Sequence, residues 1–401
     1  MKLLSNVKKL AAFSAATTLP IFSLTAANWA QDATGTFNWE DAVNWSTNPS
    51  PAPGDTGAAT GEIANILSGS LQNRNLVVDI NSNLPVATGN VRIDASQGAT
   101  ASNVLNINNG GTLNANNTTT TLLTLNEGGT NNPGASATIN VFTGGTLNAS
   151  QIRLARDEGT SSVNVNGGAV NWTGGGGGAP FAMRTDSANA TAELNISNGG
   201  TFTSDNNGAQ FLMGSATSLV TVSGSSTFQM LGNSGVGGRA ILNMNTPNAV
   251  ATDTKISLDG SSATFVVEDI NLFSQTVSGS MATLELTADS AGVSTVDIIN
   301  SGNINLSSDG TTNSILDLDL TNYNLANGTS LVIADYTNGN YNGGTFDTIN
   351  VTGANFDSID YLTGSLITVN VTAVPEPAAY ALLFGVTGLV FGVIQRRKSS
   401  K

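Results

Sequence analysis

The chain has 401 residues, of which only 10% are charged, and its formal net charge at neutral pH is −14. An ordinary soluble domain carries about 25% charged residues, so short strands with many turns are expected instead of long amphipathic helices. Cysteine and histidine are both absent. Their absence excludes disulfides, thiolate nucleophiles, thiolate or imidazole metal sites and any Ser-His-Asp arrangement. We assign no catalytic residue, no metal ligand and no cofactor.

The basic residues are concentrated at the two ends of the chain. Three lie in the first ten residues and four in the last six. The segment 28–373 therefore has seven basic residues against 27 acidic ones, a net charge of −20. Binding to nucleic-acid phosphates relies on lysine and arginine. The sequence thus excludes a nucleic-acid partner and predicts an acidic body.

Residues 1–27 have the pattern of a secretory signal peptide. An apolar stretch over 10–24 follows a positively charged start and precedes small residues; the charges are those of Lys2, Lys8 and Lys9. We predict cleavage after Ala27, with cleavage after Ala30 as the alternative. An uncleaved membrane anchor is the other interpretation, which the short, Thr- and Ser-containing apolar core disfavours.

The segment 28–75 is predicted to be an N-terminal cap. It contains Trp39 and Trp45, followed by the turn-rich run Pro-Ala-Pro-Gly-Asp over 51–55. This order resembles the Trp-rich opening of autotransporter-like β-helix proteins. Two tryptophans six residues apart are also compatible with core aromatics or a platform that stacks on sugars. We favour a cap, because the exposed end of a repeat array must be covered.

The segment 76–281 is a repeat array. Apolar/polar alternation over about four residues, typical of a half-buried strand, is followed by a glycine pair that supplies positive φ at a corner. The clearest copies are VLNINNGGTLN (104–114), ATINVFTGGTLN (137–148), SVNVNGGAVNW (162–172) and ELNISNGGTFT (193–203). Each unit is therefore predicted to be strand, tight corner, strand.

A second repeated element adds a third strand to each unit. The sequences IRL (152–154), FAM (181–183) and FLM (211–213) recur at intervals of 29 and 30 residues. We predict an all-β fold, a right-handed parallel β-helix with coils of this length. Val, Ile, Leu and Phe would point inward, and outward Asn, Thr and Ser would form ladders that hydrogen-bond along the stack. The alternative is a stack of antiparallel hairpins, because Gly-Gly also suits a hairpin turn.

The glycine-pair pattern fades over 282–373, where strands are predicted at 314–320, 330–336 and 366–371. This order is similar to the C-terminal end of autotransporter passenger domains. We predict that the segment 282–373 is a C-terminal β cap.

Carboxylates are the plausible chemical groups in this composition, and three pairs are adjacent or nearly so: Asp157/Glu158, Glu268/Asp269 and Asp317/Asp319. A glycosidase needs two carboxylates about 5–10 Å apart. Neighbouring residues of a strand point to opposite faces, which disfavours Glu268 with Asp269. Asp317 and Asp319 share a face, and we interpret them as the solvated side of an edge strand.

Three arginines fall at similar points of neighbouring repeats: Arg153, Arg156 and Arg184. We favour surface ion pairs with the nearby acids Asp157, Glu158 and Asp186. The alternative is a small basic ladder, since a polysaccharide lyase needs a basic proton acceptor beside calcium-bound acids. The Gly-Gly-x-Gly-x-Asp repeat of calcium-binding β-rolls does not occur.

The last segment, 374–401, has three parts in a fixed order. The box Val374, Pro375, Glu376 and Pro377 precedes an uncharged run over 378–394, and the basic residues Arg396, Arg397 and Lys398 follow. The run is long enough, at roughly 25 Å as a helix, to approach the thickness of a membrane core. The basic cluster predicts a cytoplasmic end.

This tail resembles the PEP-CTERM sorting signal of bacterial surface proteins. The resemblance implies that an exosortase, a transpeptidase-like membrane enzyme, reads Pro375, Glu376 and Pro377 and removes the tail. It also implies a transient membrane anchor and delivery to the cell surface or extracellular matrix. A simple tail anchor is the alternative.

The leading functional hypothesis is a secreted, non-enzymatic structural or adhesive protein, whose polar rows make many weak contacts with extracellular polysaccharide. A carbohydrate-active enzyme, either a lyase or a hydrolase, on the same scaffold is the first alternative, because some parallel β-helices carry such activities. A self-assembling surface-layer protein with incomplete end caps is the second.

Overall fold

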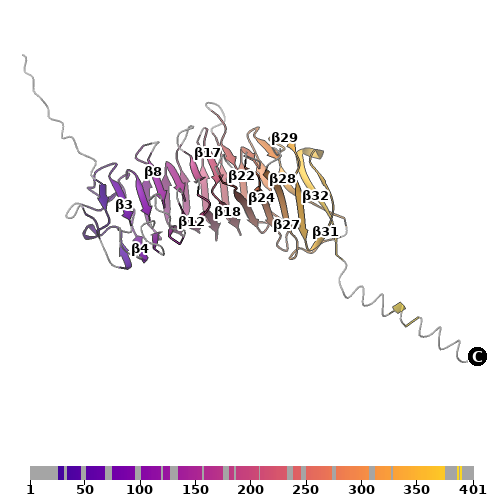
Figure 1. The fold of residues 1–401 in the computed structure, drawn as a ribbon, viewed down its shortest axis with the longest axis horizontal. Helices are drawn as coiled ribbons and strands as arrows, with labels where there is room; N and C mark the ends of the chain where they lie inside the picture. The colour runs from indigo at the N-terminus through magenta and orange to yellow at the C-terminus, as the bar shows by residue number, and fades with distance from the viewer. Residues whose placement is uncertain are drawn as a thin grey trace, which may run out of the picture.

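The computed structural model describes most of the repeat body. The described residues are 26–30, 34–46, 51–67, 75–94, 101–118, 121–126, 134–155, 158–174, 180–184, 187–206, 208–232, 238–244, 250–272, 277–306, 312–326, 328–374, 386–387 and 389–390. Their strands stack into one elongated body, with the first described strands at one extreme and the last described strands, β31 and β32, at the other (Figure 1).

Three sheets run along the body, and from β5 to β30 each complete coil contributes one strand to each sheet. Sheet 1 consists of β1 (Ala26–Asn28), β3 (Ile63–Leu67), β5 (Val91–Asp94), β8 (Leu122–Leu125), β11 (Gln151–Leu154), β14 (Phe181–Arg184), β17 (Gln210–Gly214), β20 (Ile241–Asn243), β23 (Asp269–Asn271), β26 (Asn303–Leu306) and β29 (Asn340–Gly344). Sheet 2 consists of β2 (Gly35–Asn38), β4 (Asn75–Ile80), β6 (Ser102–Ile107), β9 (Ser136–Phe142), β12 (Gly159–Asn166), β15 (Ala190–Ser197), β18 (Thr217–Ser223), β21 (Asp253–Asp259), β24 (Ser280–Thr287), β27 (Thr312–Asp319) and β30 (Thr348–Thr352). Sheet 3 consists of β7 (Thr112–Ala115), β10 (Thr146–Ala149), β13 (Ala169–Trp172), β16 (Thr201–Ser204), β19 (Thr227–Met230), β22 (Thr264–Val267), β25 (Val296–Ile298), β28 (Thr329–Asp335), β32 (Leu366–Ala373) and β31 (Ala354–Asp360).

The coils are joined by parallel pairing. Ile152 lies opposite Phe181 and Phe181 opposite Phe211, which are the spacings of 29 and 30 residues predicted for one coil. Antiparallel strand pairing among the described strands is confined to β28–β32 and β31–β32. The β-solenoid is thus confirmed, and the alternative stack of antiparallel hairpins is wrong. The handedness stays a prediction.

The core is a set of columns in which one apolar side chain per coil lies on the next. In the middle coils the columns become aromatic: the rings of Phe202 and Phe228 stack at 5.2 Å and those of Phe228 and Phe265 at 4.7 Å. Phe181 and Phe211 form a second stack at 4.4 Å. All five rings are fully buried, so stacked aromatics fill the interior of these coils.

The glycine pairs form the corners between sheets 2 and 3. Gly199 has φ +77°, a left-handed conformation that favours glycine, and nothing lies near where its Cβ would be. A Cβ on Gly200 would instead stand 2.3 Å from the carbonyl oxygen of Val165 in the preceding coil. The first glycine of the pair turns the chain, and the second lets neighbouring coils approach.

The N-terminal end is closed by tryptophans. Trp39 and Trp45 are buried, their rings 4.7 Å apart, and the ring of Trp29 lies 5.0 Å from that of Trp45. The indole Nε1 of Trp39 donates to the carbonyl oxygen of Pro53, and that of Trp45 to Trp39. A short 3-10 helix, η1 (Ala42–Asn44), carries this turn. This burial leaves neither Trp39 nor Trp45 available as a sugar platform. That 28–75 forms a cap stays a prediction.

Parallel strand pairing continues past residue 281, where the repeat array is predicted to end, and antiparallel pairing begins only with β32. The boundary between 281 and 282 falls inside β24, which pairs in parallel with β21 and β27. Parallel stacking continues to β30, and β32 then turns back along β28. A second 3-10 helix, η2 (Thr363–Ser365), precedes β32. Tyr341 and Tyr361 stack at 5.8 Å over the end of sheet 1.

The predicted signal and sorting segments fall largely outside the described residues. This holds for Lys2, Lys8 and Lys9, for the Pro375–Pro377 box and for the basic cluster Arg396, Arg397 and Lys398. Of the apolar run over 378–394, only 386–387 and 389–390 are described. Within the described residues, no helix has the length and hydropathy that crossing a membrane requires.

Candidate binding surface

The most regular surface feature is a column of polar side chains on the outer face of sheet 2. Nδ2 of Asn106 donates to Oδ1 of Asp79 at 2.8 Å, and the same contact recurs from each asparagine to the one before it. The distances are 2.9 Å for Asn140, 2.9 Å for Asn164 and 3.0 Å for Asn195. The column faces outward because its neighbours along each strand, such as Leu105 and Ile107, are buried.

A second column lies on the outer face of sheet 3. Asn148 donates to Asn114 at 2.7 Å, Asn171 donates to Asn148 at 2.8 Å, and the hydroxyl of Thr203 donates to Asn171 at 3.1 Å. Both columns follow the strand register without a shift. The predicted hydrogen-bonded ladders of outward Asn and Thr are confirmed.

Each ladder asparagine retains hydrogen-bonding capacity. An asparagine side chain has two N–H donors and an oxygen with two lone pairs. The ladder uses one donor and one lone pair on Asn140, and the same holds for Asn164. A half-exposed row of donors and acceptors therefore repeats at the strand spacing of about 4.8 Å. Such a row matches hydroxyl groups, which both donate and accept.

The polar face changes character along the stack. In the register of sheet 2, Asn195 is followed by Thr221, Ser257, Glu285, Asp317 and finally Asn350. Residues 253–360 include 14 acidic residues and one basic residue, Lys255. The two asparagine columns of sheets 2 and 3 thus lie in the less charged coils, and the C-terminal coils are strongly acidic.

Two acidic groups in these coils have opposite environments. Burial by itself would raise the pKa of Glu285, but hydrogen bonds from Lys255 and Ser257 outweigh it and lower that pKa. Asp297 lies opposite Asp335 of the next coil. Burial, and then repulsion from Asp335, raise the pKa of Asp297. Folding thus favours the charged form of Glu285 and disfavours the charged form of Asp297.

The predicted carboxylate pairs are held by structural contacts. Glu268 is buried and accepts from the backbone N–H of Ala240 and from Asn300, both at 2.8 Å. Asp269 accepts from the backbone N–H of Asn303 at 2.7 Å. Asp157 lies outside the described residues. Glu158 accepts from the hydroxyl of Ser187 at 3.2 Å.

Asp317 and Asp319 correct one expectation. They lie on one outward face, but β27 pairs with β24 on one side and β30 on the other, so it is not an edge strand. The parallel pairing of β27 with β30 places one more strand on sheet 2 beyond Asp317 and Asp319. Nδ2 of Asn350 donates to Asp317 at 2.6 Å, and the hydroxyl of Thr321 donates to Asp319 at 2.6 Å.

The alternative basic ladder is wrong for its described members. Arg153 lies opposite Ala182, whereas Arg184 lies opposite Gly214, because the two arginines are not at equivalent strand positions. Arg156 and Asp186 lie outside the described residues. The ion pairs that the described chain forms include Arg239–Asp269 at 3.4 Å and Lys255–Glu285 at 2.8 Å.

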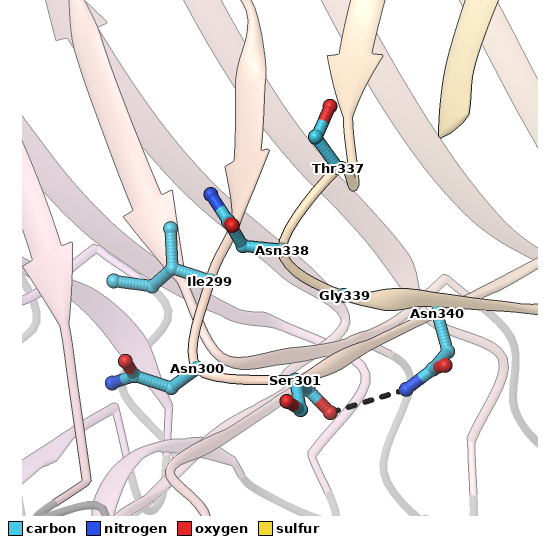
Figure 2. A pocket seen from close by; sticks show the side chains of 7 residues that line it. All are labelled: Ile299, Asn300, Ser301, Thr337, Asn338, Gly339 and Asn340. Carbon is cyan, nitrogen blue, oxygen red and sulfur yellow. Dashed lines mark hydrogen bonds between the residues drawn. The ribbon is translucent and has the colours of Figure 1, made fainter. Parts of the chain in front are cut away.

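A hollow of about 520 Å³ lies between two successive corner turns, 299–301 and 337–340 (Figure 2). Nδ2 of Asn340 donates to the carbonyl oxygen of Ser301 at 3.2 Å across its rim. Asn300 and Asn338 add amide groups, and none of the lining residues is charged or aromatic. The described residues contain no group of three or more acidic side chains arranged to hold a metal ion.

The remaining predicted site residues lie at the ends of the body. Val374 is exposed directly after β32. Ala27 is buried in β1 opposite Ala64, so cleavage after Ala27 would cut that strand. Neither the burial of Glu268 nor the tyrosines at the end of sheet 1 follow from the sequence pattern. No known protein family, curated protein or solved structure matches the chain.

Proposed function

We propose that the protein is secreted and sorted to the bacterial cell surface or polysaccharide matrix, where it acts as a non-enzymatic structural or adhesive element. The observation that carries this proposal is the pair of outward asparagine ladders, which offer repeated donors and acceptors over several coils. Many weak contacts along one rigid scaffold add up to useful avidity. A right-handed β-helix is the finer fold that we propose.

The ligand that best suits these ladders is a polysaccharide rich in free hydroxyl groups. Its hydroxyls pair with the unused amide donors and lone pairs, and a neutral polymer avoids repulsion from the body charge of −20. Binding to immobilised neutral and acidic polysaccharides tests this. Replacing Asn140 and Asn164 by leucine should weaken binding to the neutral polymer. Replacing Asn355, an exposed residue of β31 outside both columns, by leucine should not. Release of new reducing or unsaturated ends would favour the enzyme alternative instead.

The route to the surface rests on the tail. An exosortase would recognise Pro375, Glu376 and Pro377, with the helix after them as a transient membrane anchor. Cell fractionation of the wild type and a Glu376→Ala variant tests this. The wild type should reach the surface fraction with a mass reduced by loss of the tail. The variant should keep its full C-terminus and remain with the inner membrane; normal processing of the variant would contradict the proposal.

A further inference from the structure

The strand β30 ends sheet 2 with an unprotected edge. It pairs with β27 over five register positions, and its sequence, Thr-Ile-Asn-Val-Thr, has no charge and no proline. Among the described strands, none pairs with its other side. Natural proteins block such edges with charges, prolines, bulges or covering segments, and β30 itself carries none of the first three.

The alternation of backbone groups along β30 determines which N–H and C=O groups face the free edge. The N–H of Leu320 donates to the carbonyl oxygen of Thr352 at 2.9 Å, so the backbone groups of Thr352 face β27. Groups of alternate residues point to opposite sides of a strand. The N–H and C=O of Ile349 and Val351 therefore face the free edge, in the pattern that an additional strand requires.

The side chains of the same two residues lack a cover. Ile349 and Val351 face the interior but remain half-exposed. Their register partners in β27, Leu316 and Leu318, are 0% and 2% exposed. One more strand on sheet 2 would place apolar side chains beside Ile349 and Val351 and extend the core by one step.

Several other strand edges at the two ends are protected. At the N-terminal end, the backbone N–H of Ser46 donates to the carbonyl oxygen of Asn28 and so covers the outer edge of β1. At the C-terminal end, β31 carries Asp357 and Asp360. The pairing of β26 with β29 is interrupted by a register shift after Ile304, and such irregularities discourage further pairing. Among the three edge strands at the C-terminal end, β30 is thus the exception.

The charge around β30 selects the kind of strand that fits. Asp317, Asp319 and Asp347 lie on or beside the last two strands of sheet 2, and the sequence has no lysine or arginine from 256 to 395. A second copy of this end would bring the same negative charge. A positively charged strand would be attracted to it.

We propose that the free edge of β30 is a docking site for an extended, lysine- or arginine-containing segment of a partner polypeptide, which adds a strand to sheet 2. The backbone of Ile349 and Val351 supplies the hydrogen bonds, and their side chains receive the apolar residues of the added strand. The surrounding aspartates select for positive charge. This inference does not depend on polysaccharide binding.

The test uses protein purified from its own cells and a short capped peptide of alternating lysine and valine, with binding measured by calorimetry. The peptide should bind, and rising salt should weaken it. A glutamate/valine peptide of the same length should not bind. A lysine/valine peptide that is N-methylated along one edge should bind with an affinity about tenfold or more lower. Its methylated edge cannot donate backbone hydrogen bonds.

The protein variants place the site on β30. Val351→Pro removes one N–H at the free edge and leaves the bonds to β27 intact, so it should weaken binding about tenfold or more. Val351→Thr keeps that N–H and should bind nearly as the wild type does. The proposal would be overturned by absent binding, by equal binding of the glutamate peptide or by undiminished binding to Val351→Pro. A concentration-dependent dimer that Val351→Pro abolishes would also overturn it, by naming a second copy as the occupant.

Discussion

Lys255 Nζ lies 2.8 Å from Glu285 Oε2, so an ion pair joins two adjacent coils on the outer face of sheet 2. Ser257 Oγ donates to the other oxygen of the same carboxylate at 2.7 Å. Both charged side chains are about one-third exposed, at 36% and 30%. Solvent screening therefore limits the contribution of this pair to stability to at most about 1 kcal/mol.

Replacing Glu285 by glutamine should destabilise the protein at neutral pH and have little effect in acid. The pKa of Glu285 is lowered on folding, so its stabilisation exists above the ordinary glutamate pKa and is lost as the pH falls through the folded-state value. Urea denaturation at pH 7 and pH 3 measures this. A double-mutant cycle with Lys255→Met isolates the pair; equal destabilisation at both pH values would contradict the assignment.

Replacing Asp297 by asparagine should have the opposite effect. Burial and the neighbouring Asp335 raise the pKa of Asp297, so the folded state binds this proton more tightly than the unfolded chain does. Its favourable contribution is present in acid and is lost as the pH rises through the raised pKa. The variant should therefore show a higher urea midpoint than the wild type at pH 7, with the difference shrinking towards pH 3. Asp319→Asn is the control, and because hydrogen bonds from Thr321 lower the pKa of Asp319, its effect should have the reverse sign.

The β-solenoid could be predicted from the sequence because its signals are local and repeated. Alternation around Asn140 and Asn164 marks strands, and glycine pairs such as Gly199-Gly200 mark corners. Recurrence at about one coil length then requires stacking. The parallel pairing and the ladders follow from this repetition.

The ends and the ion pairs could not be predicted in the same way. No glycine pair follows β30, so the repeat pattern does not mark this strand and places Asp317 on an edge strand. The contact between Lys255 and Glu285 joins residues 30 positions apart and depends on the loop length between two coils. Similarly, the difference between the registers of Arg153 and Arg184 is set by where each strand begins.

Two adjacent glycines should differ in their tolerance of alanine. Gly200→Ala places a methyl group 2.3 Å from the carbonyl oxygen of Val165, and backbone cannot yield without separating two coils. We expect a cost of about 3 kcal/mol, at the upper end of ordinary overpacking. Gly199→Ala meets open space but keeps φ +77°, so only conformational strain of about 1 kcal/mol is expected. Equal unfolding midpoints for the two variants would refute this division of roles.

Tyr341 should ionise late in an alkaline titration. Burial, followed by the neighbouring Tyr361 and Tyr336, raises the pKa of Tyr341 to about 12. Spectrophotometric titration near 295 nm should show a late step that Tyr341→Phe removes. Because this pKa is raised on folding, the stability linked to Tyr341 is lost as the pH rises above the ordinary tyrosine range. The free energy of unfolding of Tyr341→Phe should accordingly fall less steeply than that of the wild type as the pH rises. An unchanged titration curve would show that Tyr341 is not the group that ionises late.

The aromatic stack in the middle coils should be the most sensitive part of the core. Phe228 lies between Phe202 at 5.2 Å and Phe265 at 4.7 Å, and its ring is 0% exposed. Removing the ring leaves a cavity that two coils share, so Phe228→Ala should cost about 3–5 kcal/mol. Phe228→Leu should cost less, because leucine refills part of the space. Phe356→Ala is the control, since Phe356 is 42% exposed and its replacement should change the urea midpoint little.

Because each coil contacts mainly its neighbours, hydrogen exchange in Phe228→Ala should increase first in β16, β19 and β22 and reach the terminal coils last. Uniform loss of protection along the body would mean that the solenoid unfolds as a single unit instead.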